Sequence, residues 1–101
     1  MTVSACPVAV VRAPAEAVWA LLADPAGYSA FWDTRVRRVV PPGPAQPGQV
    51  VEGWPARLIV EAVDTAHYQI RFSARLPLGL LGLEVITCAP LDVASCRVTY
   101  G

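Results

Sequence analysis

The stretch Arg12–Trp32, RAPAEAVWALLADPAGYSAFW, decides the fold because it is the only clearly helical part of a chain that otherwise has the pattern of β-hairpins. A strand-like apolar run at 8–11 leads into a helix start at 13–16. There the proline suits a first turn, and the glutamate complements the positive end of the helix dipole. The apolar residues within 18–22 then fall at helical spacing on one face. This part of the sequence predicts a strand that runs directly into a helix.

A second short helix is predicted immediately after the first. Asp24 and Pro25 end the first helix; the aspartate can cap the next one, and the proline suits its first turn. Tyr28, Phe31 and Trp32 share one face of that second helix. The predicted order is one strand, two short helices and then strands for the rest of the chain.

After this helical part the sequence alternates with the period of β-strands. The clearest case is 67–75, where one face carries Tyr68, Ile70, Phe72 and Ala74 and the other carries His67, Gln69, Arg71, Ser73 and Arg75. Strict alternation is typical of an antiparallel sheet with one buried and one solvated face. Further strands are predicted at 35–40, 49–54, 57–63, 83–89 and 95–100. The proline- and glycine-rich segment 41–48 is predicted to be a stiff loop between neighbouring strands.

The amino-acid composition and charge limit the classes of function that the chain can have. The hydrophobic fraction is 54%, the charged fraction 16% and the formal net charge zero, so an apolar surplus has to enter a core, a cavity lining or an interface. Eight basic and eight acidic residues are scattered along the chain without a basic tail or an acidic tract, so nucleic-acid binding has little support. No apolar run is long enough to span a bilayer, and no signal peptide is recognised at the N-terminus. Three cysteines without a paired spacing favour a cytoplasmic chain with reduced thiols, in which Cys88 and Cys96 are small buried side chains rather than a cross-strand disulfide.

The order of these features resembles the START-like, Bet v 1-like (SRPBCC) superfamily, especially its bacterial polyketide cyclase/dehydrase and lipid-transport branch. The pattern is an apolar strand, "a-P-x-x-V-W", "L-x-D" and an aromatic-rich second helix ending in Trp; it is carried here by 10–19, 22–25, Tyr28 and Phe31-Trp32. The resemblance implies an α+β helix-grip fold over residues 1–101, with a curved antiparallel sheet and two short helices after the first strand. It also implies a cavity between the sheet and the helices that binds a hydrophobic small molecule of lipid, polyketide or isoprenoid type.

The residues expected to line such a cavity are aromatic or aliphatic, with one threonine. They are Trp32, Trp54, Leu58, Val60, Tyr68, Ile70, Phe72, Val85, Thr87, Val98 and Tyr100. For each single aromatic residue, ordinary core packing is the competing interpretation. A polyketide aromatase/cyclase or dehydratase using the same cavity is the alternative function.

Cavity chemistry of that kind needs a general acid or base inside an apolar pocket. The candidates are Tyr68, Tyr100, Thr87 and Glu52, but no catalytic motif is matched and the catalytic residues stay unassigned. Arg71 and His67 fall on the solvated face. One histidine and three separated cysteines match no metal-ligand spacing, and no nucleotide-binding motif is present, so no cofactor is expected.

The end of the sequence carries a further expectation. START-like domains normally continue into a long C-terminal helix across the concave sheet face, and nothing after Tyr100 supplies one. The chain is therefore interpreted as a fragment or a truncated gene product, with a sheet face open to water. Each large apolar side chain left exposed there forfeits on the order of 1.5–3 kcal/mol. A protein-interaction role, in which a homodimer covers this face or 76–83 forms a docking surface, is the third candidate.

Overall fold

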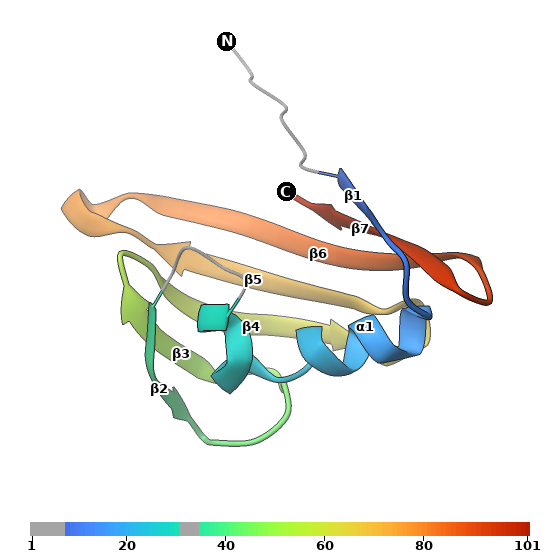
Figure 1. Ribbon diagram of the computed structural model, residues 1–101. Coiled ribbons are helices and arrows are strands. Elements are labelled where there is room, and N and C mark those ends of the chain that lie inside the picture. The colour runs from blue at the N-terminus through green and yellow to red at the C-terminus, as the bar shows by residue number, and fades with distance from the viewer. Residues whose placement is uncertain (1–7, 31–34) are drawn as a thin grey trace, which may run out of the picture.

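The computed structural model describes residues 8–30 and 35–101, which form one curved antiparallel sheet with short helices on one side (Figure 1). The elements in chain order are β1 (Val8–Val11), α1 (Ala15–Leu22), η1 (Pro25–Ala30), β2 (Arg35–Val40), β3 (Val50–Trp54), β4 (Arg57–Asp64), η2 (Thr65–His67), β5 (Gln69–Arg75), η3 (Pro77–Gly79), β6 (Leu81–Asp92) and β7 (Ser95–Tyr100). The predicted α+β class is confirmed, with two short helices directly after the first strand.

The seven strands found in the described part of the chain belong to the same sheet, in the order β1-β7-β6-β5-β4-β3-β2. Pairing of Val8 with Thr99 and of Val11 with Cys96 joins the first strand to the last. Because every pairing is antiparallel, the turns after β3 and β5 lie at one end of the sheet, and those after β4 and β6 lie at the other. Within residues 8–30 and 35–101 no long helix follows β7.

The two helices form where the sequence predicts them, but the cap of the first and the type of the second differ from the prediction. Pro14 is the cap of α1 rather than its first helical residue, and its carbonyl accepts hydrogen bonds from Ala17 N and Val18 N at 3.0 and 3.2 Å. The second helix is a 3-10 helix that ends at Ala30. Phe31 and Trp32, predicted on its aromatic face, lie outside the described residues.

The sheet has two faces, here called the inner face, which is packed against α1 and η1, and the outer face. In β5 the side chains of Ile70, Phe72 and Ala74 are buried on the inner face, whereas Arg71 and Arg75 are exposed on the outer face. The predicted alternation of this strand is therefore confirmed. In β4 a bulge between Val60 and Ala62 shifts the alternation, so Val63 takes an inner position; uninterrupted alternation over the predicted strand 57–63 would have placed Ala62 on the same face as Leu58 and Val60.

The inner face is not open to water, which corrects the expectation drawn from the sequence. Leu58, Val60, Ile70 and Phe72 are each at most 2% exposed. Aromatic contacts attach the helical layer to the sheet: Tyr28 packs edge-on against Phe72, with ring centroids 6.1 Å apart. The short helices thus bury these strands, and no second copy is required over them. Dimerisation stays a prediction.

The loop at 41–49 is organised by one buried side chain. Gln49 is 0% exposed, and its Nε2 donates hydrogen bonds to the carbonyls of Pro41 (2.9 Å), Gly43 (3.1 Å) and Pro44 (3.3 Å). Prolines supply no backbone N–H donors, so the carbonyl groups of this loop need donors from elsewhere. The side-chain amide of Gln49 donates to three of them. This arrangement explains how a loop so rich in proline connects two adjacent strands.

Candidate functional site

The candidate site is the inner face between the sheet and the helical layer. Four of the predicted lining residues meet there through strand pairing: Val60 lies opposite Phe72 in the β4–β5 ladder, and Leu58 and Ile70 occupy inner positions on the same two strands. On the far side of β6, Val98 and Tyr100 of β7 are half-buried and pack against the same core. The structure thus brings these six predicted residues to one apolar surface.

Tyr68 reaches this surface by a different route than predicted. It is not part of a strand but ends η2 in the left-handed conformation (φ 50°), and its carbonyl accepts a hydrogen bond from Cys88 N at 2.9 Å. Its ring stacks on Trp19 of α1 at a centroid distance of 5.4 Å. Tyr68 therefore closes the α1 end of the inner face, and Trp19, which was not among the predicted lining residues, closes it too.

Val85 and Thr87 were predicted on the same face as Phe72, and this placement is wrong. The β5–β6 register pairs Val85 with Arg71 and Thr87 with Gln69, which puts both on the outer face. Thr87 Oγ1 accepts a hydrogen bond from Gln69 Nε2 at 3.2 Å. The inner positions of β6 are occupied by Glu84, Ile86 and Cys88.

Two further candidates from the sequence, Trp54 and Glu52, do not contribute to the inner face. Trp54 lies opposite Arg35, at the position after the inward-facing Gly53, and is 63% exposed. Glu52 forms an ion pair with Arg38 (Nη2 to Oε2, 2.7 Å) on the outer face, so it is no acid or base of the cavity. Trp32 lies outside the described residues.

Glu84 is the inner-face residue that the sequence reasoning missed. The register pairs it with Phe72, so its side chain projects from β6 on the same side as Ile86. Its Oε2 atom is buried and has no hydrogen-bond partner among the described residues. A buried carboxylate oxygen without a donor is costly, and such groups are rare in proteins. Glu84 shares its alternation with Ile86 and Cys88, and that face of β6 is identified as the inner one only by the β5–β6 register.

Two buried titratable groups of the core, Tyr28 and Cys88, are not poised for chemistry. Tyr28 donates its hydroxyl hydrogen to the carbonyl of Leu22, and burial, with a smaller contribution from Asp24, raises its pKa far above the usual range. Cys88 and Cys96 are free and buried, as the preferred interpretation expected. Burial, together with the neighbouring Cys96 thiol, raises the pKa of Cys88 to about 12, so this thiol is a poor nucleophile.

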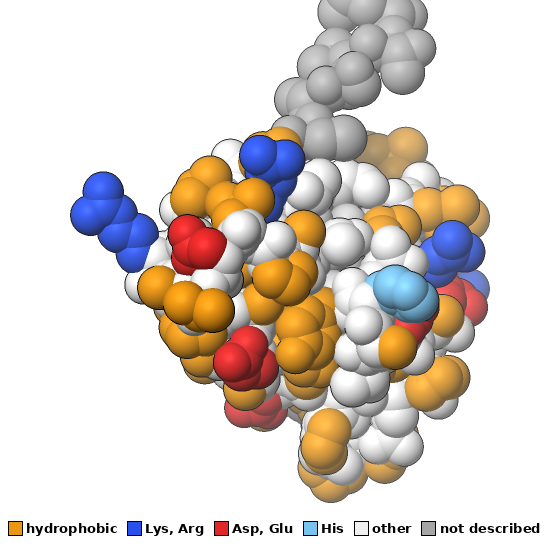
Figure 2. All heavy atoms as spheres, turned by 90° about the vertical axis from the view of Figure 1, so that its right-hand side faces the viewer, with side chains coloured by type: hydrophobic (Ala, Val, Ile, Leu, Met, Phe, Trp, Pro, Cys, Tyr) orange, Lys and Arg blue, Asp and Glu red, His pale blue; other side chains and the backbone are white. Residues whose placement is uncertain are grey.

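His67 is solvated, as predicted, and lies at the opposite end of the sheet from Glu84. Its Nδ1 is 2.8 Å from Asp64 Oδ2, and this hydrogen bond holds the pKa of the Asp64 carboxyl below its usual range. Figure 2 shows the histidine at the surface beside an acidic side chain. No group of three or more potential metal ligands occurs within the described residues.

This fold belongs to the helix-grip, Bet v 1-like class. A family model described as "Polyketide cyclase / dehydrase and lipid transport" matches residues 3–101, and the chain belongs to that family. Norcoclaurine synthase from Thalictrum flavum, in complex with dopamine and hydroxybenzaldehyde, is similar in structure, with a TM-score of 0.71 at 15% sequence identity. That match covers 93% of this chain and 64% of the synthase chain, so the present chain spans less than two thirds of its length.

A truncated form of the same plant enzyme is similar with a TM-score of 0.66 at 14% identity, covering 99% of this chain and 76% of that one. These likenesses concern the fold alone. A search of the curated proteins found no match.

Proposed function

We propose that this chain binds a hydrophobic small molecule, of lipid, polyketide or isoprenoid type, between the inner face and the layer formed by α1 and η1. The observation that carries the proposal is the continuous apolar surface of β4, β5 and β6, with Phe72 at its centre and Tyr28 above it. Because Ile70 and Phe72 are fully covered, a ligand has to separate the η1 segment from the sheet or enter beside it.

Glu84 narrows the class of ligand. Its buried Oε2 atom lacks a donor within the described residues, and the residue opposite Glu84 on β5 is the apolar Phe72. A ligand with an apolar body and one hydroxyl or ammonium group satisfies both features at once. The apolar body supplies the affinity, and the hydrogen bond to a carboxylate in a dry site supplies orientation.

An enzyme of the cyclase or dehydratase type is the second candidate, and Glu84 is the observation that favours it. A carboxylate in an apolar site is a suitable general base for abstracting a proton next to a carbonyl group. Tyr100 lies opposite Ile86, two positions along β6 from Glu84, so a phenol and a carboxylate occupy the same region of the inner face. Loss of turnover but not of ligand affinity in Glu84→Gln would identify this role.

The binding proposal is tested with the neutral apolar probe N-phenyl-1-naphthylamine, whose fluorescence rises in apolar sites. Phe72→Ala is expected to weaken probe binding more than Arg71→Ala, but removing a buried phenylalanine costs about 3–5 kcal/mol of stability. Phe72→Leu is the milder variant, and Arg71→Gln is its matched control from the adjacent position on the outer face.

We expect Phe72→Leu to reduce the probe affinity several-fold while Arg71→Gln leaves it unchanged, with thermal unfolding checked for both. Equal effects of the two substitutions would show that the probe does not occupy the inner face.

A further inference from the structure

The turn between β5 and β6 exposes an unusual number of leucines. Leu78 is 98% exposed, and Leu81 and Leu83 at the start of β6 are 75% and 82% exposed. Leu76 and Leu80 of the same turn are also exposed. Single exposed apolar residues are ordinary, but a contiguous group marks a surface that is covered by something else.

The backbone of this turn holds one of these leucines outward at a conformational cost. Leu78 has φ 68° and ψ 19°, the left-handed region in which side chains other than glycine, asparagine and aspartate are disfavoured. A hydrogen bond from Leu76 N to Leu80 O, 2.9 Å long, closes the turn. Because the Leu78 side chain lies in water, no packing contact within the fold offsets the cost of its left-handed backbone. Backbone outliers of this kind point to a functional role.

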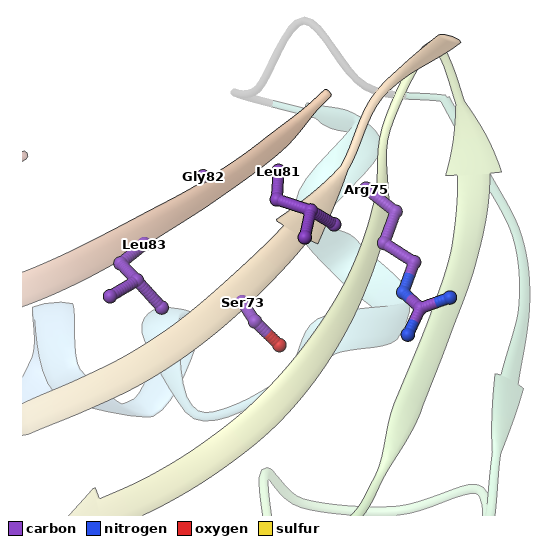
Figure 3. A pocket seen from close by; sticks show the side chains of 5 residues that line it. All are labelled: Ser73, Arg75, Leu81, Gly82 and Leu83. Carbon is purple, nitrogen blue, oxygen red and sulfur yellow. The ribbon is translucent and has the colours of Figure 1, made fainter. Parts of the chain in front are cut away.

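Three arginines lie at the same end of the sheet as the leucines, on the strands that follow β6 in the sheet order. Arg57 lies opposite Arg75 in the β4–β5 ladder, and Arg35 lies opposite the exposed Trp54 at the end of β3. None of these three arginines forms an ion pair within residues 8–30 and 35–101. Figure 3 shows the side chain of Arg75 beside that of Leu81. Together with Ser73, Gly82 and Leu83 these two residues line a hollow of about 300 Å³.

Charge is distributed unevenly along the sheet, although the chain as a whole is neutral. The nearest outer-face carboxylates are already engaged: Glu52 pairs with Arg38, and Glu61 accepts a hydrogen bond from Ser73 at 2.6 Å. The opposite end carries Asp64 and Asp92 in its turns. The leucine-bearing end is therefore the basic pole of the described structure.

We propose that this end, here called the leucine tip and made of Leu78, Leu80, Leu81, Leu83, Trp54, Arg35, Arg57 and Arg75, docks on the surface of an anionic phospholipid bilayer. Protruding apolar side chains with a basic rim match the layered chemistry of that surface, because leucine and tryptophan enter the headgroup region while arginine binds phosphates. A second copy of the chain fits less well, since it would bring unpaired arginines together.

This inference is independent of the proposed ligand on the inner face, and vesicle flotation tests it. The full chain is mixed with vesicles of phosphatidylcholine alone, or with about one third phosphatidylglycerol added, at an ionic strength of about 0.1 M. We expect binding to the anionic vesicles, at least tenfold weaker binding to the neutral ones, and release of bound protein at about 1 M salt.

Two variants and two matched controls locate the contact. Leu78→Asn suits the left-handed turn and is expected to weaken binding roughly tenfold. The double variant Arg57→Gln/Arg75→Gln is expected to weaken it roughly 25-fold, at about fivefold per arginine. Val93→Asn, at a 92% exposed residue beyond β6, and Arg97→Gln, on β7, are expected to bind as the unchanged chain does.

The proposal is overturned if the chain ignores anionic vesicles, or if the controls lose as much binding as the tip variants. It is also overturned if light scattering shows a dimer that Leu78→Asn dissociates, because the tip is then an interface between two copies.

Discussion

Replacing Glu84 with methionine is expected to raise the free energy of unfolding by about 1–3 kcal/mol, the cost of leaving a buried acceptor without a donor. The substitution keeps the length of the side chain and removes Oε2, which has no hydrogen-bond partner within the described residues. Most substitutions destabilise a protein, so a gain at this position indicates a group kept for binding rather than for folding.

The assay is reversible urea unfolding followed by tryptophan fluorescence, with Glu61→Met as the control. Glu61 also lies in the sheet but accepts a hydrogen bond from Ser73 at 2.6 Å and is exposed, so its replacement is expected to be neutral or slightly destabilising. The same Glu84→Met protein is expected to lose its preference for probes that carry a hydroxyl or ammonium group. If Glu84→Met destabilises the chain by more than Glu61→Met does, its carboxylate is satisfied in solution and the reasoning fails.

Three further predictions concern the buried and capping groups. Tyr28→Phe removes the hydrogen bond to the Leu22 carbonyl and is expected to cost about 1–3 kcal/mol in urea unfolding; no loss would mean that water replaces the phenol. Burial raises the pKa of the Cys88 thiol from 9.0 to about 12 in the folded chain, so the unfolded chain loses the thiol proton at a lower pH. The free energy of unfolding therefore falls above pH 9.0, by up to about 1.4 kcal/mol per pH unit. Cys88→Ala should flatten that fall between about pH 9 and pH 10 in reducing buffer, and an unchanged slope would contradict the burial argument. Because the His67 contact lowers the pKa of Asp64, its ionised carboxylate stabilises the fold above pH 3.8, and this stabilisation is lost as the pH falls. Asp64→Asn should therefore remove part of the acid sensitivity of unfolding, measured by circular dichroism. An identical acid transition would rule out the His67 contact as the cause of that sensitivity.

The helical start and β5 could be predicted from the sequence because local signals determine them. Proline near the helix start, an apolar stripe within 18–22 and the Asp24-Pro25 break act within a few residues. In β5 the pattern of two residues per repeat is uninterrupted, so the buried and solvated sides followed directly.

The inner face of β6 could not be predicted because its register depends on the turn before it. That turn runs from Leu76 to Leu80 with a left-handed Leu78, a conformation that nothing in LPLGLL indicates. One position of shift moves every side chain to the other face, which is why Val85 and Thr87 were assigned inward and Glu84 was overlooked.

Bulges and tertiary contacts account for the remaining differences. The bulge near Glu61 inserts one extra residue into β4, so the residues after Val60 face the opposite side of the sheet from the one that simple alternation predicts. No proline or glycine marks this bulge in the sequence. Burial of the inner face depends on Tyr28 and Trp19, which contact residues more than forty positions away. Spacing along the chain does not reveal such contacts.

Within residues 8–30 and 35–101, the structure has no helix long and apolar enough to cross a membrane. Location in the cytoplasm stays a prediction from the sequence. Docking through the leucine tip needs no such helix, since it engages only the surface of a bilayer.

Methyl NMR with N-phenyl-1-naphthylamine decides whether an apolar ligand occupies the inner face, because intermolecular nuclear Overhauser effects report contact rather than indirect change. The inner face offers methyl groups on Val60, Ile70 and Ile86, and the outer face offers those of Leu81 and Leu83. We expect contacts from the probe to the methyl groups of Val60, Ile70 and Ile86 and none to those of the two leucines. Contacts confined to Leu81 and Leu83 would contradict this expectation and place the apolar ligand on the outside of the sheet.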